Sequence, residues 1–370
     1  MRCSQMSFRS MLRLLVPLGA VLSLTMVWGQ NYAETDLVAN QSGTAMATDP
    51  NLVNAWGLSR SSGSPWWVAN AGSGTSTLHQ GDGTAVPLVV TIPALGNGKG
   101  SPTGTVYNGG PGFELAPGMP AAFLFVTEDG LIAGWNSKVN PTTAVVMVKS
   151  PGASYTGVAI ATWNGQQYLY AADFKNGRID VFDSSFNLVS LGYNAFHPAQ
   201  RDDEGTLGPF NLSPYNVQNI GGTLFVAFAK LDPSNGFSTH APGAGRVAAF
   251  APNGQLIRQY QEGIWFNAPW GLALAPGDFG SFSHDLLVGN FGNGQILAFN
   301  ASSGKFDGYM LDASGKTISI PLLWALSFGS GGAGKSGSAT SLFFTAIGGT
   351  GGLFGTLDPV PSTLVQGNSN

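Results

Sequence analysis

The chain has 370 residues, of which 16 are Lys or Arg and 20 are Asp or Glu, so its net charge at pH 7 is −4. Charged residues make up only 10% of the sequence and no basic run occurs, which argues against nucleic acid as a partner. A hydrophobic content of 43%, with 53 Gly and 22 Pro, indicates a folded chain with many tight reversals rather than a disordered one.

The first residues have the pattern of a secretory signal peptide. Three arginines, the last of them Arg13, precede an apolar stretch from Leu14 to Trp28, and Val27–Gly29 supplies a cleavage site. The stretch is short for a membrane span. We therefore expect a secreted or periplasmic protein with no stable membrane span after cleavage; a retained N-terminal anchor is the alternative. The only cysteine, Cys3, lies in this segment, so the mature chain would contain no thiol.

Short apolar runs, rich in Val, Ile, Phe and Tyr and bounded by Gly, Asn, Asp or Pro, predict strands through the rest of the chain. They form units in which the second strand ends at a residue that recurs about every 55 residues. These residues are Asn70, Thr127, Asp173, Phe228, Asn290 and Ala346. Six such units, with no helical pattern between them, predict an all-β, six-bladed β-propeller, because closing the blades into a ring hides the sheet edges.

The ends of the chain are expected to meet in the last blade. Residues 322–357 contain only three apparent strands, and the segment from Glu34 to Ala39 precedes the first unit without a partner of its own. We expect this N-terminal segment to supply the missing strand; a loose tail is the alternative. The predicted organisation is a signal peptide at 1–29, a single propeller domain at 30–358 and a polar C-terminal tail at 359–370.

Two patterns that suggest chemistry have simpler interpretations. Residues Gly329–Ser336 match the phosphate-binding loop pattern, but they lead into a strand near Leu342 rather than into the helix that phosphate binding requires. The histidines occupy unequal positions in their units, unlike ligands to a metal at the hub of a propeller, and we expect them on the surface. They are His79, His197, His240 and His284.

Oxygen-bearing side chains recur where the second strand of a unit ends. Asn70, Asp173 and Asn290 take this position, and Glu128 follows Thr127. Asn and Asp often stabilise turns by bonding the nearby backbone, which is one interpretation. The other is a ring of oxygen ligands at the hub that binds a hard cation such as Ca²⁺.

Large aromatic residues recur near the start of the units. They are Trp56, Trp270 and Trp324, with Tyr215 and Asn216 in the corresponding place of the fourth unit. Packing between blades explains this pattern, since aromatic side chains dominate such cores. If the side chains face the mouth of the channel instead, they would line a pocket for an apolar or sugar-like ligand.

Longer stretches carry a family resemblance and cover nearly the whole mature chain in order. They are residues 49–59, 128–135, 172–183, 267–276, 286–294 and 323–326. In these stretches the chain resembles a family of exported bacterial six-bladed propellers of uncharacterised function, some of which end in a PEP-CTERM sorting tail. The resemblance implies export and the fold but no activity. The chain departs from the family in lacking the sorting tail and in its connection at 196–213.

Two hypotheses of function follow. In the first, the protein is an exported propeller that binds a small molecule, a glycan or an extracellular protein through one face of the ring. In the second, it is a calcium-dependent hydrolase resembling the lactonase propellers, with its site at the hub. That likeness rests on fold analogy. Calcium is a cofactor only in the second hypothesis, and the sequence leaves open whether the protein is an enzyme.

The signal-peptide prediction has a direct test. N-terminal mass spectrometry of the exported protein should find a mature chain that begins near Gln30, because the cleavage site ends at Gly29. A chain that still starts at Met1 and stays in the membrane fraction would show that the segment is an anchor.

Overall fold

The computed structural model describes residues 28–192, 194–198, 212–331, 335–349 and 351–361. The predicted signal peptide, except its last two residues, and most of the predicted polar tail lie outside these ranges. Within them, the only helical element is a 3₁₀ turn, η1 (Gly280–Phe282), and no helix there is long and apolar enough to cross a membrane.

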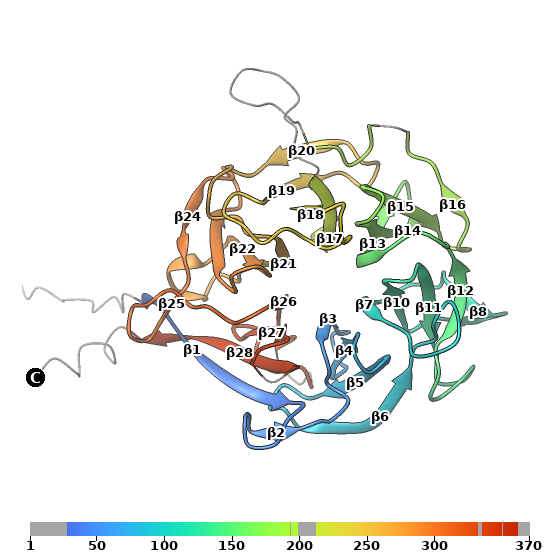
Figure 1. Ribbon diagram of the computed structural model, residues 1–370, viewed down its shortest axis with the longest axis horizontal. Coiled ribbons are helices and arrows are strands. Elements are labelled where there is room, and N and C mark those ends of the chain that lie inside the picture. The colour runs from blue at the N-terminus through green and yellow to red at the C-terminus, as the bar shows by residue number, and fades with distance from the viewer. Residues whose placement is uncertain (1–27, 193, 199–211, 332–334, 350, 362–370) are drawn as a thin grey trace, which may run out of the picture.

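Five antiparallel blades of four strands each follow one another around a central axis (Figure 1). In each blade the first strand is innermost. Blade 1 contains β3 (Ala55–Ser59), β4 (Trp66–Asn70), β5 (Thr75–His79) and β6 (Ala85–Thr91). Blade 2 contains β7 (Pro102–Tyr107), β10 (Phe123–Thr127), β11 (Leu131–Trp135) and β12 (Val145–Lys149), with a small hairpin of β8 (Glu114–Ala116) and β9 (Met119–Pro120) between its first two strands.

The next three blades repeat this plan. Blade 3 contains β13 (Tyr155–Trp163), β14 (Gln166–Asp173), β15 (Arg178–Asp183) and β16 (Leu188–Val189). Blade 4 contains β17 (Leu212–Ile220), β18 (Thr223–Lys230), β19 (Gly245–Phe250) and β20 (Leu256–Gln259). Blade 5 contains β21 (Pro269–Leu274), β22 (Asp285–Asn290), β23 (Ile296–Asn300) and β24 (Phe306–Tyr309).

Blade 6 joins the two ends of the chain. It contains β26 (Leu323–Phe328), β27 (Leu342–Ala346), β28 (Leu353–Pro361) and, outermost, β1 (Trp28–Ala39). The antiparallel pairing places Glu34 opposite Leu357 and Ala39 opposite Leu353, which confirms the predicted closure. The short strands β2 (Ala47–Thr48) and β25 (Leu311–Asp312) pair with β1 in parallel, so part of its outer edge is also covered.

The hydrophobic core lies between neighbouring blades rather than in one central layer. In β18, Val226 and Phe228 pack with side chains of blade 3, whereas Phe225 and Ala227 pack with side chains of blade 5. Both faces of a middle strand are therefore buried. This explains why the middle strands appear in the sequence as continuous apolar runs and not as alternating ones.

The six recurrent residues of the sequence are structurally equivalent. Each pairs with the corresponding residue of the innermost strand of its blade. The pairs are Ala55–Asn70, Pro102–Thr127, Tyr155–Asp173, Pro214–Phe228, Pro269–Asn290 and Leu323–Ala346. A shift of register lies next to every one of these pairs, so the same irregularity recurs in all six blades.

Glycines follow the shift because the backbones of neighbouring inner strands approach closely there. A Cβ atom on Gly57 would lie 2.4 Å from the carbonyl oxygen of Thr103 in the next blade. A Cβ on Gly104 would lie 2.9 Å from the backbone nitrogen of Val158 in the blade after that. At these two positions only a residue without a side chain allows the packing, whereas blades 4 and 6 have Asn216 and Ala325 in the equivalent place.

We predict that Gly57→Ala destabilises the ring by about 2 kcal/mol or more, because a backbone oxygen cannot move aside for the added methyl group. Gly63→Ala is the matched control, since a Cβ at Gly63 would meet no atom within 4 Å. Chemical denaturation of both variants measures the difference. Equal free energies of unfolding would show that the inner strands can separate at no cost.

Candidate ligand-binding site at the channel mouth

The predicted aromatic residues form a buried cluster, which we call the aromatic plug, at the end of the central channel where the inner strands begin. Trp56, Tyr215, Trp270 and Trp324 occupy equivalent positions on β3, β17, β21 and β26, and all are at most 5% exposed. The Trp56 and Trp324 rings stack with 3.7 Å between their centroids. Phe291, directly after β22, stacks on the other side at 3.9 Å from Trp324.

Hydrogen bonds between blades hold the plug together. The Trp270 indole of blade 5 donates to the carbonyl of Thr156 in blade 3, two blades away, at 3.0 Å. The Asn216 amide in turn donates to the carbonyl of Trp270 at 2.9 Å. These bonds satisfy backbone groups on the free edges of the inner strands. The five residues predicted to bind a ligand thus lie together, and they pack mainly against one another.

The predicted calcium ligands mostly bond protein groups. Asp173 accepts hydrogen bonds from the backbone of Ser154 at 3.0 Å and from the Asn176 side chain at 2.7 Å, and it pairs with Arg178 at 3.4 Å. Burial raises the pKa of Asp173, and the bonds from Ser154 and Asn176 partly offset this effect. This arrangement is the turn chemistry that we considered as an alternative.

The side chains of Asn290 and Asn70 also form hydrogen bonds with protein groups, but only Asn290 uses both its oxygen and its nitrogen. The Asn290 side chain accepts from the backbone of Asn267 at 3.1 Å and donates to the carbonyl of Trp265 at 2.8 Å. The Asn70 amide donates to Thr77 at 3.0 Å, while its carbonyl oxygen is buried without a partner.

Glu128 differs from the other three because its carboxylate forms no hydrogen bond with any described residue. Burial, reinforced by Asp129, raises the pKa of Glu128. The described residues contain no group of three or more His, Cys, Asp or Glu side chains that could hold a metal. The calcium site therefore remains a prediction.

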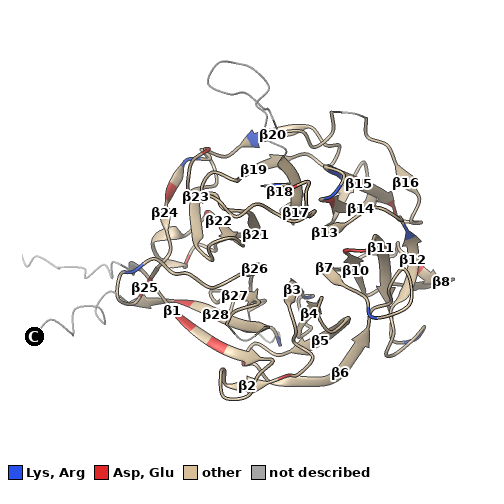
Figure 2. Cartoon of the chain, in the orientation of Figure 1, with Lys and Arg blue, Asp and Glu red and all other residues tan. Residues whose placement is uncertain are grey.

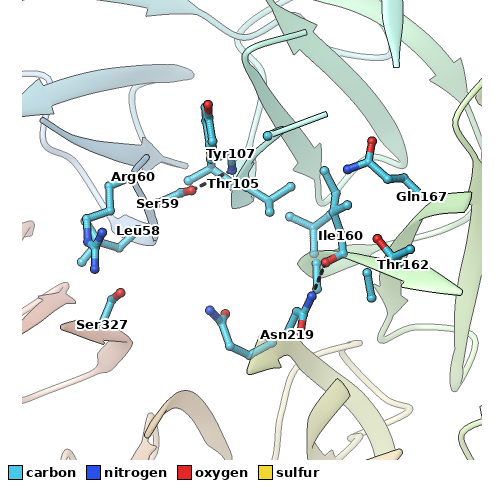
Figure 3. A pocket seen from close by; sticks show the side chains of 16 residues that line it. Leu58, Ser59, Arg60, Thr105, Tyr107, Ile160, Thr162, Gln167, Asn219 and Ser327 are labelled. Atoms are coloured by element: carbon cyan, nitrogen blue, oxygen red, sulfur yellow. Dashed lines mark hydrogen bonds between the residues drawn. The ribbon is translucent and has the colours of Figure 1, made fainter. Parts of the chain in front are cut away.

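A cavity of about 450 Å³ opens at the other end of the channel, where the inner strands finish (Figure 3). We call it the mouth cavity. Strands of blades 1, 2, 3, 4 and 6 line it. Its polar side chains include Ser59, Arg60, Gln167, Gln218, Asn219 and Ser327. A narrower pocket continues inward from it to Asn216 and Trp270, so the aromatic plug forms the floor of the channel.

Arg60 is the only charged residue among the described residues that line the mouth cavity. Its Nε and Nη2 atoms donate to the carbonyl of Phe328 in blade 6, at 2.9 and 2.7 Å. The guanidinium also lies over the Trp66 ring, 5.3 Å from its centroid. Burial lowers the pKa of Arg60. No carboxylate pairs with it in the described part of the chain, where charged residues lie mostly toward the outside of the ring (Figure 2).

The neutral side chains of the mouth cavity fall into two groups. The Ser59 hydroxyl accepts from the backbone of Tyr107 at 2.9 Å, and the Asn219 amide donates to the carbonyl of Ile160 at 2.7 Å. Gln167 and Gln218, in contrast, make no side-chain hydrogen bond to a described residue. Their amides are available to a ligand.

Sequence reasoning missed the mouth cavity, although one signal was present. Arg60 is the only charged residue among the six equivalent positions near the ends of the inner strands. The others are Tyr107, Ile160, Asn219, Leu274 and Phe328.

The expectation that all histidines lie on the surface was wrong for His79. This side chain is fully buried, and its Nε2 lies 3.3 Å from a carboxylate oxygen of Asp49.

Fold and channel together define a six-bladed β-propeller with one plugged and one open channel end. No family model matches the chain. It is 30% identical to the uncharacterized protein L690 of Acanthamoeba polyphaga mimivirus over 301 residues, which is 79% of this chain and 76% of L690. It is also 30% identical to protein R648 of the same virus over 315 residues, 83% of this chain and 75% of R648. The chain belongs to the family of these proteins.

These relatives are viral, so they give no support to a bacterial origin or to a link with PEP-CTERM proteins. Among solved structures, the chain is similar to a streptogramin B lyase, with a TM-score of 0.51 and 12% identity over 90% of this chain and 99% of that one. It is similar to the soluble aldose sugar dehydrogenase of Escherichia coli, with a TM-score of 0.54 and 11% identity over 89% and 100%. At these identities the likeness shows the propeller fold alone.

The contacts of Asp173 generate a prediction about calcium. We expect Asp173→Asn to lower the free energy of unfolding by about 1–2 kcal/mol, because the new amide group would face the donors of Asn176 and Arg178. The loss should be the same in calcium and in chelator. Thermal and chemical denaturation under both conditions measure it.

Asp183→Asn is the matched control, because Asp183 caps a turn of the same blade through Ser185 and Asn187 in a more exposed place. It should cost less than Asp173→Asn. If calcium stabilises the wild-type protein and only Asp173→Asn loses this effect, the calcium-site hypothesis is supported instead.

Proposed function

We propose that this protein is an exported propeller that binds a small polar ligand in the mouth cavity. The observation that carries the proposal is a cavity walled by five of the six blades whose lining includes donors and acceptors without partners. Export rests on the signal-peptide pattern and on the resemblance to exported propellers. Binding through one face of the ring is the first of the two hypotheses drawn from the sequence.

The dimensions of the mouth cavity suit a small molecule. Its volume of about 450 Å³ falls within the usual range of ligand pockets, roughly 300–1,000 Å³. A ligand that enters must replace the hydrogen bonds of the water it displaces. Gln167 and Gln218 offer amide groups for this purpose, and Arg60 offers N–H donors. A polar ligand therefore fits the lining better than an apolar one.

The aromatic plug, which lies beneath the mouth cavity, also supports the proposal. It closes the channel beneath the cavity, so a ligand enters and leaves by one mouth only. Because the plug residues are buried and Trp270 is bonded to the backbone of blade 3, the floor of the channel is held in place. When a ligand binds to a preformed site of this kind, little free energy is lost in ordering the protein.

A substitution that fills the mouth cavity tests the proposal. Ligand-detected NMR with a library of polar metabolites should find compounds that bind the wild-type protein, and Gln218→Trp should abolish their binding because the indole occupies the cavity. Gln255→Trp, in an exposed turn outside the cavity, should bind as the wild type does. Unchanged binding of the same compounds by Gln218→Trp would place the site elsewhere.

A further inference from the structure

We propose that the ligand of the mouth cavity carries a carboxylate, and that Arg60 binds this group through its Nη1 and Nη2 atoms. The inference rests on the proposed function and adds the chemical class of the ligand. It follows from the unused donors of Arg60, from the charge of the lining and from the size of the cavity.

The hydrogen bonds of Arg60 leave one edge of the guanidinium free. An arginine side chain has five N–H groups. Nε and Nη2 each use one for the carbonyl of Phe328, and Nη1 makes a long bond of 3.5 Å to the carbonyl of Ser61. One N–H on Nη1 and one on Nη2 remain without a partner among the described residues. These two groups form the fork that a carboxylate accepts with both oxygens.

The guanidinium is already fixed in place for this contact. The Phe328 carbonyl orients its Nε and Nη2 edge, and the Trp66 ring covers one of its faces. Neither group neutralises the charge, because a carbonyl is a dipole and an aromatic ring offers only a weak attraction. The side chain therefore needs no ordering when an anion arrives.

The electrostatics of the lining favour an anion of single charge. Burial lowers the pKa of Arg60, but a guanidinium stays charged in proteins, so the cation is held partly out of water without a counter-ion among the described residues. No described residue of the lining is Asp or Glu. An anion that enters would offset this cost. With one cation in the cavity, a monovalent carboxylate matches the site better than a phosphate dianion.

The other lining residues and the volume of the cavity indicate the chemistry and size of the rest of the ligand. Gln167, Gln218 and Ser327 are neutral groups that bond hydroxyls or amides. A water molecule takes about 30 Å³ of liquid volume, so the cavity has room for a molecule with on the order of a dozen non-hydrogen atoms. The class that fits is a hydroxylated carboxylate up to the size of a sugar acid.

The test compares acids with uncharged amides of the same shape on the full mature protein. Isothermal titration calorimetry is run with glucuronate and glucuronamide, and with lactate and lactamide. We expect at least one acid to bind at least tenfold more tightly than its amide. Equal binding of acid and amide would overturn the carboxylate inference and leave the proposed function standing. No binding of any of the four would overturn the carboxylate inference, and the metabolite screen would then decide the proposed function separately.

Substitutions assign the effect to Arg60. Arg60→Met should bring the ratio of acid to amide affinity close to one, and Arg60→Lys should leave an intermediate ratio because lysine keeps the charge but loses the fork. Arg258→Met, which removes a partly buried arginine from the outermost strand of blade 4, should keep the wild-type ratio. If Arg60→Met keeps the wild-type ratio of acid to amide affinity, the inference is overturned. Because this ratio compares two ligands on one protein, it stays interpretable if Arg60→Met is less stable.

Discussion

The close approach of neighbouring inner strands is the constraint on which the other features of this propeller depend. At Gly57, Gly104, Gly157 and Gly271 a side chain would collide with the next inner strand. A register shift with one extra residue on the inner strand lies beside each of these four positions. Strands held this close allow a side chain of one blade to reach the backbone two blades away. The bond from Trp270 to Thr156 depends on this geometry.

The same inner strands form both ends of the channel, but one end is filled by side chains and the other is open. At the beginning of the inner strands, large aromatic side chains fill the space, and the Trp270 indole bonds a backbone carbonyl of blade 3. At their far ends a cavity remains, with Arg60 and several neutral polar side chains in its lining. The repeat therefore provides the scaffold, and the positions that break the repeat provide the site. A shared fold with a lyase and a dehydrogenase is consistent with this division, because function resides in such positions.

The fold could be predicted because its signals are local and repeated. A strand, a turn residue and a Trp-Gly pair recur along the chain, and the segment at Glu34–Ala39 lacked a local partner, so both the blade number and the closure followed. The mouth cavity could not be predicted in this way. Arg60 meets the Phe328 carbonyl across 268 positions of sequence, and no periodicity connects them. The hydrogen bond from Ser154 to Asp173 and the contact of His79 with Asp49 could not be predicted either, because these partners do not recur at the repeat period.

The closure of blade 6 has a consequence for the order of events in synthesis. The first described strand, β1, pairs with the last described strand, β28, so more than 300 residues separate Ala39 from its partner Leu353. Until β28 exists, β1 lacks its antiparallel partner and has only the short strands β2 and β25 to pair with, so the ring stays open. Contacts of such long range form slowly. A chain that crosses a membrane with its N-terminus first would therefore reach the far side unfinished and close its ring there.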